Sequence, residues 1–294
     1  MLRVSLIICT YNRAEILPRC LVAAVSQTLP RSEFEVILVD NASTDNTHAI
    51  AERFPEVRYL LCPFRGLSQA RNTGAAAARA PIVTYIDDDA IAAPDLLEQV
   101  LAAFAAVPDA ACVGGRIDVT LPPRRPAWYS DDLAGYFSGF HLPCAGIQRV
   151  TDLSEFPFGA NVSFRREVIE KLGCFNVKLG RSGKDASGGE ELDLEYRIAK
   201  AGYRIYYTPQ AQVEHIIMPD RMTWSHVAKT ARAAGKNWAY YELELLRLQW
   251  SIRSDLRMLI GAVARMINRE RVPVARSQSI FYWSKILRKL RYVI

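Results

Sequence analysis

The stretch VSLIICTYNR, residues 4–13, decides the class of fold. It is a short apolar run, Val4–Cys9, that ends abruptly in polar residues. Three further runs of this kind follow at 35–39, 57–61 and 82–86, and apolar residues at helical spacing lie between them. Strands that are apolar throughout and alternate with helices are typical of a parallel sheet covered on both faces. The sequence therefore predicts an α/β protein with a mostly parallel sheet flanked by helices.

The remaining elements divide the chain into two parts. The expected helices cover 14–27, 43–54, 68–79, 94–107, 161–173 and 191–201, and two more strands are expected at 204–208 and 211–215. Residues 122–158 are rich in proline, glycine and aromatic residues, which favours a long loop region that binds an acceptor. After Pro219 the apolar pattern is mostly helical. We therefore expect a sheet domain over residues 1–217 and a helical, basic extension over residues 218–294.

Polar residues follow three of the expected strands. The runs end at Thr10, at Asp40 and at the triplet Asp87-Asp88-Asp89. In open α/β sheets, ligands bind outside the carboxyl ends of the strands. Three adjacent carboxylates repel one another, and a divalent cation that takes oxygen ligands and bridges to phosphates would relieve this. The other interpretation of the triplet is a solvated acidic turn before a helix.

Other candidate residues each allow two interpretations. Arg71 suits a pyrophosphate at an early helix position, although its spacing alone favours an exposed arginine on an alanine-rich helix. Glu190 and Glu191 open a helix after two glycines, where the helix dipole stabilises acidic residues or where a general base could lie. His215 is either a structural histidine or a metal ligand.

The net charge and the cysteines bound the function further. The chain carries a net charge of +6, with −4 through residue 217 and +10 in the last 77 residues. None of the six cysteines belongs to a CxxC pair, which argues against a zinc knuckle or a thioredoxin-like site. The pattern contains no secretory leader and no run of about 18 apolar residues. A cytoplasmic protein, peripheral on the inner face of the cell membrane at most, is therefore expected.

Six motifs in order resemble glycosyltransferase family 2, whose members have the Rossmann-like GT-A fold. They are VSLIICTYNRAEILPRCL, EVILVDNASTDNT, GLSQARNTGAAAARAPIVTYIDDD, FGANVSFRREV, GGEELDLEYRIAKAGYRIYY and VEH. The resemblance covers residues 3 to about 217 and leaves out the C-terminal quarter. It implies that a sugar is transferred with inversion from a nucleotide-diphosphate donor, with UDP as the commonest nucleotide, aided by Mn²⁺ or Mg²⁺.

The resemblance also implies a role for each matching residue. The nucleotide would be bound by residues that follow the first two strands and by the arginine of the third motif: Thr10, Tyr11, Asn12, Arg13, Asp40, Asn41 and Arg71. The DxD motif falls on the Asp triplet, so Asp87 and Asp89 would hold the metal with His215, and Asp88 would bind the ribose or the metal. Residues 159–161, ending in Asn161, would approach the donor sugar. Glu191 would be the catalytic base, and Glu190 is the alternative.

The expected function is a single sugar addition in the synthesis of a surface polysaccharide or lipopolysaccharide, with a glycan or lipid-linked acceptor. A carboxylate that removes the acceptor proton suits this chemistry, because a single displacement needs one base. A catalytically inactive, sugar-nucleotide-binding scaffold subunit is the alternative. A nucleotidyltransferase is disfavoured, because CTYNRAE lacks the glycine-rich loop that such enzymes carry after the first strand.

The tail has two interpretations of equal weight. Apolar residues recur at helical spacing among arginines and lysines over 250–294, as in helices that lie on an anionic membrane surface. The same pattern suits a helical extension that packs on protein, either the catalytic domain or a second copy in a homo-oligomer. Nucleic-acid binding is not expected, because no known motif accompanies the charge.

Overall fold

The computed structural model describes residues 1–181, 188–245, 252–268 and 271–293. The strands among these residues form one mixed sheet with the order β3-β2-β1-β4-β8-β6-β9-β5. A further strand, β7, pairs with β9 outside this order. The chain divides into two compact units. The first comprises Met1–Thr120, Ser138–Gly183 and Glu190–Ile216, and the second comprises Leu121–Phe137, Lys184–Gly189 and Ile217–Ile294.

Four strands confirm the parallel half of the sheet that the sequence predicts. They are β1 (Val4–Thr10), β2 (Phe34–Asp40), β3 (Val57–Leu61) and β4 (Ile82–Asp87). The β1, β2 and β4 strands are buried along nearly their whole length, as strands covered on both faces must be. The register sets Thr10 opposite Asp40 and Cys9 opposite Asp87. The polar strand ends therefore meet at one edge of the sheet.

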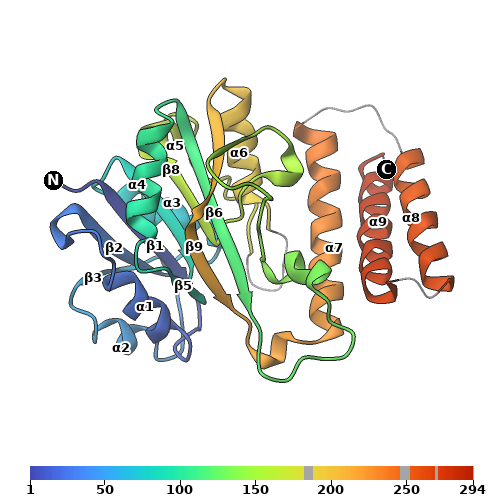
Figure 1. Ribbon diagram of the computed structural model, residues 1–294, viewed down its shortest axis with the longest axis horizontal. Helices are drawn as coiled ribbons and strands as arrows, with labels where there is room; N and C mark the ends of the chain where they lie inside the picture. Colours follow the sequence, from blue (N-terminus) through green and yellow to red (C-terminus); the bar gives the residue numbers. More distant parts are fainter. Residues whose placement is uncertain (182–187, 246–251, 269–270, 294) are drawn as a thin grey trace. The chain divides into compact units, whose positions relative to one another are not determined.

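Helices cover both faces of the sheet (Figure 1). The helices of the first unit are α1 (Leu17–Val25), α2 (Thr47–Ala51), α3 (Leu67–Ala77), α4 (Leu96–Ala106), α5 (Arg166–Lys171) and α6 (Glu190–Lys200). The α1 and α4 helices lie on one face, where the Gln27 side chain joins the end of α1 to the start of α4. The α3 and α6 helices lie on the other face.

The far half of the sheet differs from the sequence-based expectation. The helix predicted over 161–173 is wrong at its start, because Asn161–Arg165 is a strand, β8, and only Arg166–Lys171 is helical. β8 pairs antiparallel with β4 and with β6 (Ala110–Thr120). Its apolar side chains fill a gap between two buried strands, and this tertiary pairing overrides the local helical pattern.

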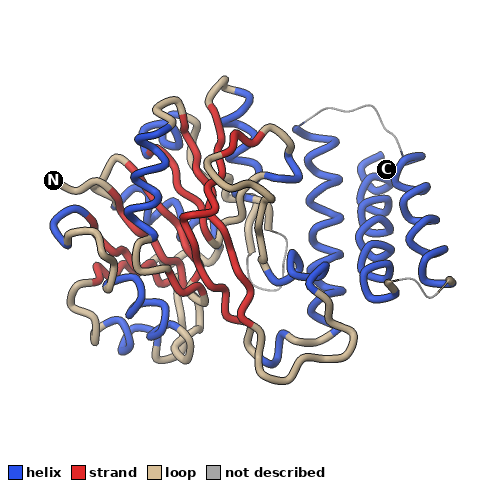
Figure 2. Tube along the Cα trace, in the orientation of Figure 1, coloured by secondary structure: helices blue, strands red, loops and turns tan. Residues whose placement is uncertain are grey.

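The last strands of the sheet also depart from the simple pattern (Figure 2). The two strands predicted at 204–208 and 211–215 form one long strand, β9 (Arg204–Ile216), with a break in register between Thr208 and Gln212 that accommodates Pro209. Two short strands, β5 (Ala90–Ala92) and β7 (Gln148–Val150), pair antiparallel with β9 and were not predicted. The helix expected at 43–54 is shorter, because only Thr47–Ala51 is α-helical.

The C-terminal part of the chain is helical, as predicted. It contains α7 (Trp224–Tyr240), a π-helical turn η5 (Tyr241–Leu245), α8 (Ile252–Ile267) and α9 (Val272–Val293). α9 packs against both α7 and α8 (Figure 1). Gly235 of α7 lies against the backbone of Phe281, where a Cβ atom would come within 2.2 Å of the carbonyl oxygen. No helix among the described residues is both long enough and apolar enough to cross a membrane.

Candidate active site

An acidic cluster lies where β4 ends. Asp87 is the last residue of β4, and Asp88 and Asp89 form the turn into β5. The β5–β9 pairing sets Ala90 opposite His215, so the imidazole reaches this turn, and its Nε2 lies 3.0 Å from Asp89 Oδ1. One ligand atom each from Asp87, Asp89 and His215 lie within 4.8 Å of one another. The structure thus brings together the three residues that the sequence proposes as metal ligands.

Arg13 supplies positive charge to this cluster. It follows β1, and its Nη2 lies 3.0 Å from Asp89 Oδ2 while its Nε lies 3.8 Å from Asp88 Oδ1. Burial, together with the charge of Asp89, raises the pKa of Asp88 to about 7. Burial also acts to raise the pKa of Asp89. The hydrogen bond from His215 and the charges of His215 and Arg13 oppose this and hold the pKa of Asp89 below its ordinary value. The cluster is therefore a site where a further cation is electrostatically favourable.

The donor atoms of the cluster suit a divalent metal. Carboxylate oxygens are the preferred ligands of Mg²⁺ and Mn²⁺, and an imidazole nitrogen suits Mn²⁺ better than Mg²⁺. His215 is 2% exposed, and its Nδ1 atom is buried without a hydrogen-bond partner among the described residues. Asp87, Asp89 and His215 therefore fit a divalent cation.

Arg71 joins the acidic cluster to the start of α6. It lies on the second turn of α3, and its guanidinium is nearly inaccessible, with a side-chain exposure of 4%. Its Nη1 donates to Glu190 Oε1 at 2.6 Å and lies 3.6 Å from Glu191 Oε2, and its Nη2 lies 3.9 Å from Asp87 Oδ1. The sequence-based preference for an exposed arginine is therefore wrong. One buried cation holds carboxylates from two separate motifs.

Aromatic rings and a glycine fix the position of Arg71. The guanidinium carbon lies 5.4 Å from the centre of the Phe175 ring and 6.0 Å from that of the Tyr85 ring. A Cβ atom at Gly159 would come within 2.1 Å of Arg71 Nη2. Residue 159 must lack a side chain for the guanidinium to occupy this place. The FGAN motif thus affects the position of Arg71 through its glycine.

The two glutamates differ in access and in charge. Glu190 has a side-chain exposure of 1%, whereas that of Glu191 is 23%. Burial and the charge of Glu191 raise the pKa of Glu190 to about 8, against the opposing charge of Arg71. Burial acts to raise the pKa of Glu191 too, but the charge of Arg71 and hydrogen bonds leave it below its ordinary value. The charge of Arg71 therefore favours the ionised form of Glu191, whose side chain is the more exposed of the two, while its Oε2 atom is buried.

The residues after β2 form a hydrogen-bonded loop. Asp40 is buried, and its two oxygens accept from the backbone N–H of Ser43 and from the hydroxyl of Tyr59. The Asn41 amide donates to the carbonyl of Phe64 and accepts from the N–H of Gly66. Gly66 has a φ of +145°, a conformation that favours glycine, and α3 begins at the next residue. Asn41 therefore helps to set where α3, and so Arg71, begins.

The loop after β1 lies beside this one. Asn12 has a positive φ of 52°, and its side-chain oxygen accepts from the N–H of Thr44. Tyr11 is exposed, and the guanidinium of Arg65 lies 4.9 Å from the centre of its ring. Thr10 is buried at the strand end. These residues, proposed for the nucleotide, thus line one edge of the sheet together with Asp40 and Arg13.

Asn161 has a role within the sheet. Its Nδ2 donates to the backbone carbonyls of Arg116 and Ala211, each at 3.0 Å. A Cβ atom at Gly115 would come within 2.2 Å of the same nitrogen. Asn161 therefore holds β8 against β6 and β9 beside the break in their register.

Sequence reasoning missed Arg181 and Tyr59. The charge of Arg181 acts on Asp89, His215, Glu190 and Glu191, so this exposed arginine lies beside both halves of the site. Its backbone carbonyl accepts from the N–H of Leu67 at the start of α3. No motif marks either residue, because both reach the site through folding and not through spacing along the chain.

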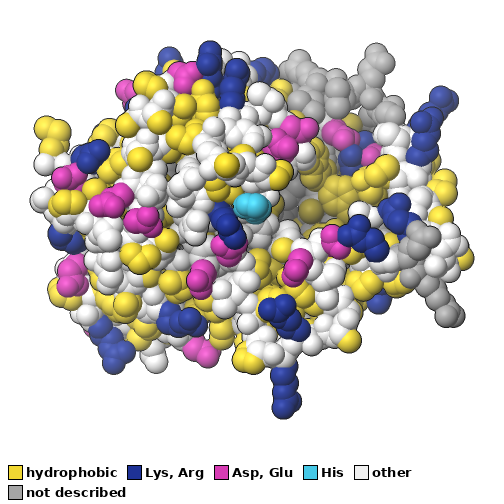
Figure 3. Space-filling view, in the orientation of Figure 1, with side chains coloured by type: hydrophobic (Ala, Val, Ile, Leu, Met, Phe, Trp, Pro, Cys, Tyr) yellow, Lys and Arg dark blue, Asp and Glu magenta, His cyan; other side chains and the backbone are white. Residues whose placement is uncertain are grey.

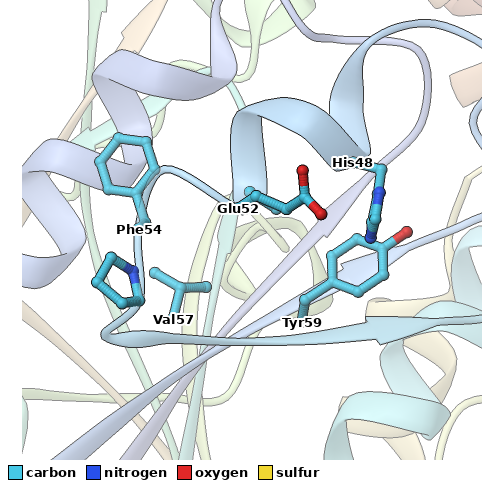
Figure 4. A pocket seen from close by; sticks show the side chains of 7 residues that line it. His48, Glu52, Phe54, Val57 and Tyr59 are labelled. Atoms are coloured by element: carbon cyan, nitrogen blue, oxygen red, sulfur yellow. The ribbon is translucent and has the colours of Figure 1, made fainter.

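A small pocket lies between α2 and β3 (Figure 4). Its volume is about 140 Å³, and it is lined by His48, Ala51, Glu52, Phe54, Pro55, Val57 and Tyr59. The rings of His48 and Tyr59 meet edge to face at 4.8 Å. Tyr59 connects this pocket to the site, because its hydroxyl donates to Asp40.

Comparison with known proteins decides the family. The model of glycosyl transferase family 2 matches residues 5–173, more than half of the chain. The chain belongs to glycosyl transferase family 2. Its glucosyl-dolichyl phosphate glucuronosyltransferase relative from Haloferax volcanii is 26% identical over 281 residues, which are 91% of this chain and 87% of the relative. The succinoglycan biosynthesis protein ExoM of Rhizobium meliloti is 26% identical over 85% of this chain and 80% of its own length.

Solved structures of two other proteins share the fold. The mannosyltransferase PcManGT from Pyrobaculum calidifontis, in complex with GDP-Man and Mn²⁺, has a TM-score of 0.65 and 21% identity, covering 98% of this chain and 87% of that one. TarS 1-349 of S. aureus, in complex with UDP, has a TM-score of 0.56 and 15% identity, covering 100% of this chain and 92% of that one. The expected GT-A fold is therefore confirmed, and the family member is a glycosyltransferase with relatives in polysaccharide synthesis.

Proposed function

We propose that this glycosyltransferase moves a sugar, with inversion, from a nucleoside-diphosphate donor to a hydroxyl of a glycan or lipid-linked acceptor in surface polysaccharide or lipopolysaccharide synthesis. The relatives support the acceptor class, because one is described as acting on a glucosyl-dolichyl phosphate and another as a succinoglycan biosynthesis protein. The solved relatives support the donor class, since they hold GDP-Man and UDP.

In this proposal the donor lies along the edge formed by the ends of β1, β2 and β4. Asp40 binds the base or ribose, with Thr10, Tyr11, Asn12 and Asn41 around it. Arg13 and Arg71 face the diphosphate, and Asp88 contacts the ribose or the metal. Asp87, Asp89 and His215 would hold a Mn²⁺ or Mg²⁺ ion, which when bound stabilises the negative charge of the leaving diphosphate. Asn161 keeps the sheet beneath the sugar in place.

Glu191 acts as the general base. Its pKa lies below the ordinary value and its side chain is partly exposed, which supports this role. It would take the proton of the acceptor hydroxyl as the new bond forms, which contributes a factor of about 10²–10⁴ to the rate. Glu190, buried beside it, keeps its proton and orients the pair through Arg71. Inversion follows, because a single displacement with one base forms no covalent intermediate with the enzyme.

The single observation that carries the proposal is the bridge made by Arg71. Its guanidinium contacts Glu190 at 2.6 Å and Glu191 at 3.6 Å, and it approaches Asp87 at 3.9 Å. The proposed base and the acidic cluster therefore both lie within 4 Å of the same guanidinium group. Sugar transfer needs the groups that bind the diphosphate and the base that takes the acceptor proton to be close together during the same step.

A thermal-shift panel tests the donor, with Mn²⁺ and UDP, GDP or dTDP. A nucleotide present at about 100 times its Kd stabilises the fold by about 2.7 kcal/mol, which raises the Tm by roughly 5–10 °C. UDP is the nucleotide expected from the family resemblance. If no nucleotide shifts the Tm, with or without metal, the proposal fails.

Transfer is tested with the corresponding nucleotide sugars by following release of the nucleotide, and the anomeric configuration of the product is read by NMR. We expect inversion. If a nucleotide sugar binds but no acceptor glycan or lipid ever stimulates its turnover, the chain is the inactive, sugar-nucleotide-binding scaffold instead.

A further inference from the structure

The α8 helix carries an exposed apolar stripe. Leu256, Ile260, Val263 and Ile267 recur at intervals of four, three and four residues, which places them along one side of a helix. They are 41%, 66%, 41% and 75% exposed, in this order. The packed side of α8 is a different one, where Asp255 and Ala262 are buried.

The α9 helix carries a matching stripe near its end. Trp283, Leu287 and Leu290 recur at intervals of four and three residues and are 52%, 37% and 43% exposed. The buried side of α9, which includes Ile286 and Lys289, faces another direction.

The two stripes lie on the same side of the helix pair. Lys289 bonds to Asp255 and Gln278 to Arg265, so the two helices run antiparallel. A helix has 3.6 residues per turn, so each residue is rotated by about 100° about the helix axis from the one before it. On each helix, the centre of the stripe is rotated by about a quarter turn from the side that contacts the other helix, in the sense in which the residue numbers increase. In antiparallel helices these two rotations lead to the same side. We call this surface the α8–α9 face; its residues are Leu256, Ile260, Val263, Ile267, Trp283, Leu287 and Leu290.

A buried ionic cluster holds the two helices in this arrangement. Lys285 Nζ lies 2.6 Å from Glu242 and 2.8 Å from Asp255, and Lys289 Nζ lies 2.5 Å from Glu242 and 2.6 Å from Asp255. Asp255 is 2% exposed and Lys289 is 3% exposed. Because four charges neutralise one another here, the two lysines add nothing to the surface charge, and the α8–α9 face has a fixed geometry.

The exposed charges of these helices all have one sign. Six exposed arginines lie on or beside α8 and α9, and one of them, Arg271, is paired with Asp132: Arg253, Arg257, Arg271, Arg276, Arg288 and Arg291. Within the described parts of 252–293 the one carboxylate is Asp255, which is buried and paired. Figure 3 shows hydrophobic and basic side chains next to one another over these helices, at the right of the view.

We propose that the α8–α9 face docks on the surface of an anionic lipid bilayer, with its apolar side chains in the headgroup region and its arginines on the lipid phosphates. The α8–α9 face has seven large apolar side chains, one of which is a tryptophan, and arginines around them. This combination is typical of helices that lie in the membrane interface. A symmetric contact with a second copy would bring arginines beside arginines, which is unfavourable. This inference goes beyond the proposed function, and it decides between the two interpretations of the tail. Residues 250, 251, 269, 270 and 294 of that tail lie outside the described residues.

Vesicle flotation of the full-length protein tests the proposal, with phosphatidylcholine vesicles that contain or lack 30% phosphatidylglycerol. Ile260→Glu places a charge in the α8–α9 face, and Met258→Glu is the matched control. Met258 is 49% exposed but lies on the opposite side of the same helix. We expect Ile260→Glu to weaken partition at least tenfold and Met258→Glu less than twofold, with unchanged Tm values.

Charge is tested with Arg253→Gln/Arg257→Gln. At about 1 kcal/mol per arginine near an anionic surface, the double variant should lose about 25-fold in partition. Equal binding of the wild type to both kinds of vesicle, or equal losses for Ile260→Glu and Met258→Glu, would overturn the proposal. The proposal would also be overturned if the wild type were a dimer that does not bind vesicles and Ile260→Glu made it monomeric.

Discussion

Replacement of Arg71 by methionine should expose the electrostatics of the site. Methionine keeps the contacts with Phe175 and Tyr85, so the change removes the charge more than the packing. Without the guanidinium, Glu190 and Glu191 face each other and lose the buried cation that they share. The variant therefore measures what the bridge contributes.

The expected size of the effect follows from burial. Arg71 and Glu190 have side-chain exposures of 4% and 1%, so water screens their interaction little. Removing one partner of such a buried pair costs about 3–5 kcal/mol. For a folded unit of this size the Tm should fall by about 6–20 °C. Arg58→Met is the matched control. Arg58 has a side-chain exposure of 37%, lies 3.8 Å from Glu35 and donates to the carbonyl of Ala77 at 2.8 Å, so its loss should cost only about 1–2 kcal/mol.

The loss should depend on pH with a defined sign. Burial raises the pKa of both glutamates in Arg71→Met, since the lowering effect of Arg71 is absent. A folded carboxyl whose pKa lies above its unfolded value loses stability as the pH rises between the two values. The Tm deficit of Arg71→Met should therefore be larger at pH 8 than at pH 5. Adding Glu190→Gln removes one of the two carboxyl groups that must stay protonated in the folded variant, and it should restore about half of the deficit at pH 8.

Differential scanning fluorimetry at pH 5 and pH 8 is the assay, with the far-UV CD spectrum as a check on the fold. A deficit that is equal at both pH values, or that Glu190→Gln does not reduce, would show that the bridge is not electrostatic. A deficit no larger than that of Arg58→Met would refute the reasoning from burial.

Three further outcomes are expected. Glu191→Gln should lower kcat about 10²–10⁴-fold in a nucleotide-release assay while the Tm and donor Kd stay near the wild-type values; normal turnover would remove Glu191 as the base. Asp89→Asn should weaken Mn²⁺ binding at least tenfold by calorimetry, whereas Asp118→Asn, whose carboxylate is 41% exposed in a surface pair, should not, and equal affinities would contradict the metal site. Gly159→Ala should lower the Tm by displacing Arg71, and it should add little to Arg71→Met; additive losses would mean that the two residues act separately.

Local patterns predicted the first half of the sheet well and the second half poorly. The runs that end at Thr10, Asp40 and Asp87 are strands because each is apolar along its whole length. In residues 161–165 only Val162 and Phe164 are apolar, and the segment runs directly into a helix, so it is pairing with β4 and β6 that makes it a strand. β5 is too short to predict, since three residues cannot show the alternation of apolar and polar side chains that marks a strand.

The sequence by itself determined the family, the edge of the sheet where the acidic triplet lies and the helical, basic character of the tail. These features depend on side-chain type and on spacing along the chain. Only the tertiary structure decided that Arg71 is buried between Asp87 and the two glutamates, that Gly159 makes room for it, and that the apolar stripes of α8 and α9 share one face. These are contacts between residues far apart in the chain, and the burial that gives them their strength exists only once the chain has folded.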